Sequence, residues 1–351
     1  MNFESDNAAG VAPAILDAIV RTNQGFAQAY GGDAVTARLK ARLAELFEHE
    51  VGVYLVATGT AANALAVAQI APPWGAVLCH EECHLAVDEC GAPEFFGAGL
   101  KLIALPGAGG KIAAPTLAAA LARGPWGGPH HTTAAVVSLT QATECGTIYR
   151  PDEIRELAAI AHAHGLKVHV DGARFANALA RLEISAAAAS WQCGIDILSF
   201  GATKGGAMGA EAIVVFDHAL ARGIEERRKR AGHLISKHRF VAAQLEAYLA
   251  DDLWLALARH ANGMADRLAL ALANAGLPAV WPVEANEIFV VLPRALDQRL
   301  RAAGARYFAW VTKDLPSRAR DADDAVLVRL VASFATTGAD VDKFLAAIRD
   351  G

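Results

Sequence analysis

The stretch VGVYLVATGTAAN, residues 51–63, joins an apolar run rich in β-branched residues to a turn and then to a helix. Six further apolar runs alternate with alanine-rich stretches, at residues 76–79, 100–105, 134–140, 166–170, 195–200 and 210–216. Such alternation predicts βα units with a mostly parallel sheet of seven strands, covered by helices on both faces. We therefore expect an α/β fold that binds its ligands where the strands end.

The residues GTAAN, directly after the first run, can form a binding site for an anion. Gly59 allows a sharp turn, and Thr60 supplies a hydroxyl and the N-cap of the following helix. The amides of the first helical turn, which includes Ala61, lack an intrahelical acceptor and face whatever anion lies there. A phosphate would fit, although a capped helix after a strand is also common without any ligand.

Two other strand ends bear charged side chains. HVDGARF, residues 169–175, places Asp171 and Arg174 at the carboxyl edge of the sheet, and SFGATKGGAMG, residues 199–209, places Lys204 in a glycine-rich loop. Each pattern alone is typical of an ordinary turn. Together with the anion site, they provide the groups that pyridoxal phosphate requires: a phosphate anchor, a carboxylate for the pyridine nitrogen and an amine that forms a Schiff base.

The order and spacing of these groups resemble the fold-type I pyridoxal-phosphate enzymes, and further motifs narrow the resemblance. These motifs are SDN near the N-terminus, QAYGGD (28–33), GTAAN, ECH with DECGAPEFF (82–96), QATECGTIYRPDE (141–153), HVDGAR and GATKGG. They look like the motifs of the low-specificity threonine aldolases, within the β-eliminating lyase and threonine aldolase superfamily. The resemblance implies a lyase that cleaves L-threonine, L-allo-threonine or phenylserine-type substrates to glycine and an aldehyde.

The resemblance also implies roles for individual residues. Lys204 would bind the cofactor, Asp171 would hold its pyridine nitrogen, and His84 would stack on its ring. The implied cofactor-binding set is Gly59, Thr60, Ala61, His84, Asp171, Arg174, Lys204 and, more loosely, Lys237 from across a subunit boundary. The implied substrate-binding set is Ser5, Tyr30, Asp88, Arg174 and Arg329, with Ser5 and the two arginines on the α-carboxylate.

The group that accepts the proton of the β-hydroxyl stays open at this point. His130, in PHHTT (129–133), matches a histidine that approaches this hydroxyl in relatives, and His84 is a second candidate. A neutral imidazole suits the pH range. A water molecule or the cofactor phosphate are alternatives, and His130 reads equally well as a solvated loop residue. Asp88 stands where many relatives have a tyrosine, so the preference at the β-carbon is open too.

The stretch HEECH, residues 80–84, has the H-E-x-x-H spacing of a zinc protease. That motif must lie within a helix so that both imidazoles share one face, whereas HEECH directly follows the apolar run 76–79. Cys79 and Cys83 are further potential zinc ligands, but no second ligand pair follows at a compatible spacing. We therefore expect no metal site, and we expect His84 to belong to the cofactor pocket.

Composition limits the class of protein. With 351 residues, 54% of them hydrophobic and 20% charged, the chain can bury a large core and is not a disordered protein. Its net charge of -5 and scattered basic residues predict a small-molecule ligand and no nucleic-acid partner. No stretch of about 18 apolar residues and no export signal is seen, so we expect no membrane partner and a cytoplasmic location.

The pattern changes from about residue 251. A long helix is followed by short strands near 279–283, 287–292, 306–311 and 326–332, with a helix at 294–304, a polar loop at 313–325 and a last helix after Gly338. We expect a large cofactor-binding domain over 1–250, to whose active site the N-terminal segment contributes, and a small α/β domain over 251–351. The resemblance implies a homodimer, commonly a homotetramer, with shared active sites.

Two alternative functions remain open. The first is a related pyridoxal-phosphate enzyme, such as a β-eliminating lyase or an aminotransferase, because the same electron sink serves several reactions. The second is an inactive pyridoxal-phosphate carrier or interaction protein. The presence of Lys204 together with Arg174 and Arg329 counts against this second alternative.

Overall fold

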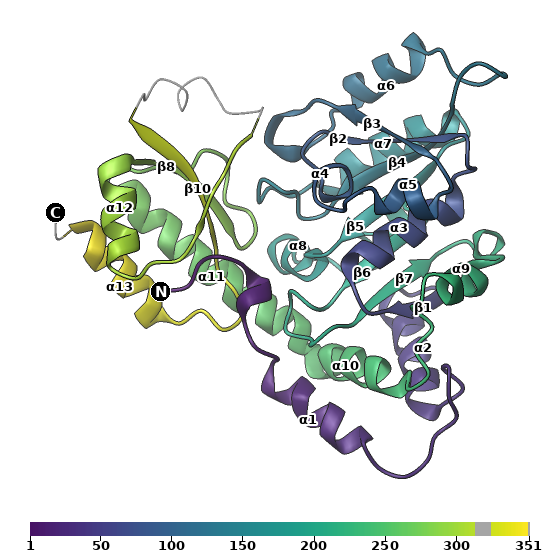
Figure 1. Cartoon of the computed structure of the whole chain (residues 1–351), viewed down its shortest axis with the longest axis horizontal. Helices are drawn as coiled ribbons and strands as arrows, with labels where there is room; N and C mark the ends of the chain where they lie inside the picture. The colour runs from purple at the N-terminus through teal and green to yellow at the C-terminus, as the bar shows by residue number, and fades with distance from the viewer. Residues whose placement is uncertain (313–323, 350–351) are drawn as a thin grey trace.

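The computed structural model describes residues 1–312 and 324–349, and its largest element is a seven-stranded sheet (Figure 1). In spatial order the strands are β1 (Gly52–Val56), β7 (Glu211–Val215), β6 (Ile197–Gly201), β5 (Lys167–Gly172), β4 (Thr133–Thr140), β2 (Gly75–His80) and β3 (Lys101–Leu105). Strand β7 runs antiparallel to β1 and β6, and the other pairs are parallel. The predicted mostly parallel sheet of seven strands is confirmed, because each apolar run forms one strand.

Helices cover both faces of this sheet (Figure 1). Along β6, Leu198 and Phe200 face a large apolar core, whereas Ile197 faces a smaller core formed with α3. The helices of this part are α1 (Pro13–Thr22), α2 (Ala34–Leu46), α3 (Gly59–Ile70), α4 (His84–Val87), α5 (Ala92–Phe96), α6 (Ala114–Arg123), α7 (Pro151–Ala163), α8 (Phe175–Leu182), α9 (Ile224–Arg230) and α10 (Arg239–Leu249). Among all helices in the described ranges, none is both long and apolar enough to cross a membrane.

Two glycines allow the ends of β5 and β6 to approach closely. A Cβ atom on Gly172 would lie 2.7 Å from the carbonyl oxygen of Ser199, and one on Gly201 would lie 2.7 Å from Cα of Ala173. Both separations are shorter than any tolerated contact, so larger side chains would push the strand ends apart. Phe200, between them in the core, packs against neighbouring aromatic rings and fixes the end of β6.

A second, smaller sheet follows the long helix α11 (Leu253–Asn274). Its order is β8 (Glu287–Pro293), β10 (Ala325–Val331) and β9 (Phe308–Ala309), all antiparallel, with α12 (Arg294–Ala302) and α13 (Gly338–Arg349) packed beside it. The predicted helices and the strands at 287–292 and 326–332 are confirmed, while the strand at 306–311 shortens to two residues. The predicted loop at 313–325 lies almost entirely outside the described residues.

The strand predicted at 279–283 is wrong. Only one isolated bridge forms there, between Ala279 and Val290, and the amide of Val280 donates to the carbonyl of Phe289 at 2.7 Å. Pro282 follows two residues later and has no N–H group to continue a ladder. The chain therefore leaves the sheet after a single contact.

The N-terminal segment runs along the smaller sheet before it reaches α1 (Figure 1). Phe3 is buried in the core of the smaller sheet, with its ring 5.3 Å from that of Phe344. The amide of Val331, in β10, donates to the carbonyl of Phe3 at 2.9 Å. The short 3-10 helix η1 (Asp6–Ala8) follows and brings its side chains toward the large sheet. The division of the chain at residue 250 stays a prediction.

Candidate active site

Two cavities lie at the carboxyl edge of the large sheet, and they adjoin because Asn7, His84 and Lys204 line both. Their volumes, about 340 and 350 Å³, suit a small molecule. The first cavity is also lined by Thr58, Gly59, Thr60, Asn63, Asp171 and Glu211. The second is also lined by Ser5, Asp88, Glu144, Arg174, Trp310 and Arg329. Most of the predicted site residues thus divide into two groups that share one lysine and one histidine.

The N-terminus of α3 borders the first cavity. Its N-cap is Thr58, with extended backbone angles (φ -139°, ψ 150°) and a hydroxyl that accepts from the amide of Ala61 at 3.2 Å. The predicted cap, Thr60, is wrong because Gly59 is already the first helical residue. Gly59 and Thr60 line the cavity, and at these helical positions their amides have no intrahelical acceptor. The amide of Ala61 is used by the cap, so two of the three predicted anion-binding amides stay available.

A chain of hydrogen bonds connects the carboxylate of Asp171 to His84. The Oδ1 atom of Asp171 accepts from the amide of Ala173 at 2.9 Å, and Oδ2 accepts from Nδ2 of Asn63 at 2.7 Å. The same Nδ2 atom donates to Oε1 of Glu89 at 2.8 Å, and this oxygen lies 2.9 Å from Nδ1 of His84. The network therefore fixes the carboxylate and the imidazole relative to each other, from two sides of the first cavity.

Sequence reasoning missed Asn63 and Glu89, although both lie within quoted motifs. Both side chains are buried. In α3, Asn63 is a polar residue that is followed by the apolar sequence ALAVA. A buried polar group on an apolar helix needs a partner, so this contrast was a usable signal. Glu89 gave no comparable signal, because its contacts with Asn63 in α3 and His84 in α4 form only in the folded chain.

Replacing Glu89 with glutamine is expected to lower the pKa of His84. The hydrogen bond that His84 donates to Glu89 raises this pKa above its ordinary value, and the nearby charges of Glu144 and Asp171 raise it less. An NMR pH titration of the His84 ring would measure the change. A Glu144→Gln variant removes a carboxylate that acts only through its charge, so it should lower the pKa by a smaller amount. An equal or larger decrease in Glu144→Gln would contradict this account.

Lys204 lies in a loop that a buried carboxylate holds in place. In the described part of the chain, Nζ of Lys204 has no hydrogen bond or ion pair, and it borders both cavities. Glu211, the first residue of β7, accepts from the amides of Ala202 and Thr203 at 3.0 and 3.4 Å. Burial raises the pKa of Glu211 to about 7. Sequence reasoning missed Glu211, which fixes the backbone directly before the lysine.

The second cavity contains two arginines with different surroundings. Arg174 is buried, and its Nε and Nη2 atoms donate to Asp6 at 2.8 and 3.2 Å. Arg329 lies against the ring of Trp310, with its guanidinium carbon 4.5 Å from the ring centroid. Its buried Nε atom has no acceptor within the described residues. Arg329 is therefore held by aromatic contact and keeps donors available for a ligand carboxylate.

Besides Ala61, three predicted site residues lie outside both cavities of this chain. His130 is exposed in the loop before β4, with its ring 6.3 Å from that of His131. Tyr30 is half exposed and lies under the ammonium of Lys229 at 4.9 Å. Lys237 is exposed beside a surface hollow that also involves Phe26. Their roles stay predictions, and within one chain the structure does not bring them to Lys204.

The HEECH stretch does not form a helix. His80 ends β2, and its Nε2 atom lies 2.9 Å from the carbonyl oxygen of Gly107, while His84 begins α4. The two imidazoles therefore do not share a helix face. The apolar run before HEECH predicted this outcome. Within the described ranges, no group of three His, Cys, Asp or Glu side chains is placed to hold a metal ion.

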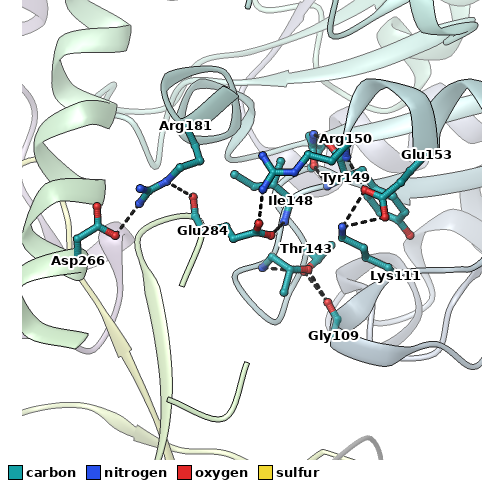
Figure 2. Close-up of polar contacts among 12 residues, drawn as sticks. Gly109, Lys111, Thr143, Ile148, Tyr149, Arg150, Glu153, Arg181, Asp266 and Glu284 are labelled. Atoms are coloured by element: carbon teal, nitrogen blue, oxygen red, sulfur yellow. Dashed lines mark hydrogen bonds and ion pairs between the residues drawn. The ribbon is translucent and has the colours of Figure 1, made fainter. Parts of the chain in front are cut away.

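The loop after β4 brings Glu144 to the second cavity, and the smaller part of the molecule holds this loop. Figure 2 shows Glu284 between Arg150 and Arg181: its side chain accepts from the amide of Ile148 at 2.8 Å and from Arg150. Its carbonyl oxygen accepts from Nε of Arg181 at 2.9 Å. These contacts tie the rim of the second cavity to the chain before β8. Glu144 itself had no predicted role.

The large sheet, the smaller antiparallel sheet and the site at the carboxyl edge define an α/β enzyme of the fold-type I class. The chain belongs to the beta-eliminating lyase family, whose model matches residues 2–295. It is 43% identical to the low specificity L-threonine aldolase of Pseudomonas aeruginosa, over 88% of this chain and 89% of that protein. A second relative with this name, from Pseudomonas sp., is 40% identical over the same shares. The chain is therefore a lyase, and the resemblance to the low-specificity threonine aldolases is confirmed.

Solved structures agree with this assignment. The threonine aldolase of Leishmania major superimposes with a TM-score of 0.91 at 28% identity, covering 99% of this chain and 98% of that one. The serine palmitoyltransferase of Sphingomonas wittichii gives a TM-score of 0.70 at 16% identity, covering 100% and 86%. The second likeness concerns the fold alone. It confirms that the architecture is shared among fold-type I enzymes of different activity.

Proposed function

We propose that this chain is a pyridoxal-phosphate-dependent aldolase that cleaves the Cα–Cβ bond of L-threonine, L-allo-threonine or a related β-hydroxy-α-amino acid, such as phenylserine. The products are glycine and an aldehyde. One observation supports this proposal most strongly: Lys204 lines a cavity with Asp171 and also lines an adjoining cavity with Arg329. A cofactor and an amino-acid carboxylate can therefore be bound on the two sides of one amine.

The residues of the first cavity fit pyridoxal phosphate. The free amides of Gly59 and Thr60 would bind the phosphate at the N-terminus of α3. Asp171 would bind the pyridine nitrogen, and the Nζ atom of Lys204 would bind the aldehyde carbon. When bound, the cofactor supplies an electron sink that stabilises negative charge at Cα of the substrate.

The second cavity would bind the substrate and select the bond that breaks. Arg329 can pair with the α-carboxylate, and its contact with Trp310 limits the directions that the guanidinium can take. Ser5 and Arg174 line the same cavity and complete its carboxylate-binding side. With the carboxylate fixed, rotation about the bond between the amine nitrogen and Cα is restricted. The Cα–Cβ bond can then be held in the orientation that favours cleavage.

His84 is the better placed of the two candidate proton acceptors. It lines both cavities, and its Nδ1 atom faces the carboxylate of Glu89 at 2.9 Å. A neutral imidazole that donates through Nδ1 has its lone pair on Nε2, which can accept the proton of the β-hydroxyl. His130 would have to come from another copy of the chain, because in this chain it lies outside both cavities.

The protein as a whole is proposed to work as a homo-oligomer with shared active sites. Tyr30 and Lys237 lie outside the cavities of their own chain, and the amide of Tyr30 donates to the carbonyl of Ser236 at 3.0 Å. The fully exposed ring of Phe26 lies next to them. Two exposed aromatic side chains so close in the chain, Phe26 and Tyr30, support a role for this region against a second subunit.

Product analysis tests the proposed reaction. The holoenzyme is expected to convert L-threonine to equal amounts of glycine and acetaldehyde, without any added keto acid. An aminotransferase would require a keto acid and would form no aldehyde, and a β-eliminating lyase would release ammonia and a keto acid. If ammonia or a transaminated product replaced glycine, the aldolase proposal would be wrong. If no product formed at all, the carrier alternative would be favoured.

A further inference from the structure

Four charged side chains of alternating sign form a row at the second cavity. Asp6 is bonded to Arg174, as described above, and Nη1 of Arg174 lies 3.1 Å from Oε2 of Glu287. Nη1 of Arg329 lies 3.8 Å from Oε1 of Glu287. The two arginines line the cavity, whereas the two acids lie behind them. The four formal charges sum to zero, so the row has no spare positive charge for a ligand carboxylate.

The two acids are held differently. Asp6 accepts from Arg174 and from Nδ2 of Asn286 at 3.1 Å. Burial acts to raise the pKa of Asp6, but Arg174, Lys204 and the hydrogen bond from Asn286 outweigh burial, and the pKa is lower than usual. Asp6 is therefore ionised at neutral pH.

Glu287 lacks comparable support. Its side chain is fully buried, and no described residue donates a hydrogen bond of good geometry to either oxygen. Burial raises the pKa of Glu287, and the attraction of Arg174 and Arg329 offsets this only in part. The carboxylates of Glu144 and Asp6 also face it and raise the pKa further. A buried carboxylate that receives no hydrogen bond is the group in such a row that protonates most readily.

Binding of a substrate carboxylate would change the charge balance. It brings one negative charge next to Arg329 and Arg174, which already form ion pairs with Glu287. In a buried site an uncompensated charge is costly, and the arginines do not lose protons near neutral pH. With Asp6 held ionised, the balance can be restored by one proton from solvent on Glu287.

We propose that Glu287 takes up a proton when the α-carboxylate of an amino acid binds to Arg174 and Arg329. The inference rests on the proposed function. The proton moves from solvent to a carboxylate oxygen, and no other bond forms or breaks. Glu287 is a positioning residue, because it acts through the two arginines and does not line the cavity. Affinity for the carboxylate should fall as the pH rises through the range in which bound Glu287 loses this proton.

Calorimetry of the holoenzyme tests the proton uptake. Titrations with glycine in buffers of different ionisation enthalpy give the number of protons bound. The wild type should take up more protons than a Glu287→Gln variant, by at most one. With glycinamide, which has the same reactive amine and no carboxylate, the two proteins should take up equal numbers. Equal uptake with glycine would overturn the proposal.

Two matched variants test the charge balance and identify the acid that is protonated. Asp6→Asn removes one negative charge from the row and leaves a spare positive charge on Arg174, so glycine should bind to this variant with less proton uptake than to the wild type. Glu144→Gln leaves the four charges of the row unchanged, so it should retain the glycine-linked proton. If Glu144→Gln lost the proton uptake and Glu287→Gln retained it, the proton would be assigned to Glu144, and the role of Glu287 would be refuted.

A measurement on the wild type covers the case in which Glu287→Gln does not fold. The infrared difference spectrum on adding glycine should show the carbonyl band of a newly protonated carboxylic acid, and glycinamide should not produce it. Absence of the band with glycine refutes the inference. The visible spectrum separates this failure from that of the proposed function: if neither amine alters the bound cofactor, the function is wrong, and if both do without proton uptake, only the role of Glu287 is wrong.

Discussion

Replacing Lys204 with alanine is expected to reduce kcat for threonine cleavage by about a thousandfold or more. The change removes the amine that is proposed to bind the cofactor covalently and that lines both cavities. Stability should change little, because the side chain has no hydrogen bond or ion pair within the described residues and is only partly buried. Steady-state assays at saturating cofactor, with thermal unfolding of both proteins, measure the two effects.

A matched lysine serves as the control for this variant. Lys101 is exposed at the start of β3 and lines neither cavity, so Lys101→Ala should retain wild-type kcat. Borohydride reduction followed by peptide mass spectrometry should place the cofactor on Lys204. Labelling of a different lysine, or undiminished activity of Lys204→Ala, would show that the amine of the reaction has been misassigned.

The seven strands of the large sheet could be predicted because each is a short apolar run between polar or glycine-rich turns. The direction of β7 was also available from the sequence. Only nine residues, 202–210, separate β6 from β7, and a parallel connection needs about a dozen or more. The strand predicted at 279–283 is wrong because the prediction relied on the apolar residues and disregarded Pro282, which has no N–H group to donate. This error concerns backbone hydrogen bonding, which hydrophobic periodicity does not report.

The site was predictable where its residues follow strand ends. Asp171 lies near the end of β5 and Lys204 lies in the loop after β6, and parallel strands bring such positions to one edge. Glu287 could not be found in this way, because it lies in the second sheet and meets Arg174 only through tertiary packing. His130 was predicted from a motif match alone, which does not report the distance of the loop from the cavities. The supporting acids therefore required the structure.

Replacing Asp171 with asparagine is expected to lower kcat for threonine cleavage by about a hundredfold or more, while the cofactor stays attached to Lys204. With the cofactor bound, the carboxylate would favour a proton on the ring nitrogen by opposite charge, and this proton would increase electron withdrawal from Cα. Asparagine has nearly the same shape but no charge. It therefore removes the electrostatic contribution and leaves the amine unchanged. Kinetic assays and the visible spectrum of the variant measure the two properties separately.

The fold around position 171 should tolerate this change. The Oδ1 acceptor for the amide of Ala173 is retained, and Nδ2 of Asn63, which loses its bond to Oδ2 of Asp171, keeps Oε1 of Glu89 as an acceptor. Asp196→Asn is the matched control, because Asp196 is a mostly buried acid that accepts from the amide of Val168 at the opposite edge of the sheet. It should retain kcat even if it loses stability. If both variants lost activity equally, the loss would reflect the sheet and not the charge at its carboxyl edge, and Asp171 would have no special role.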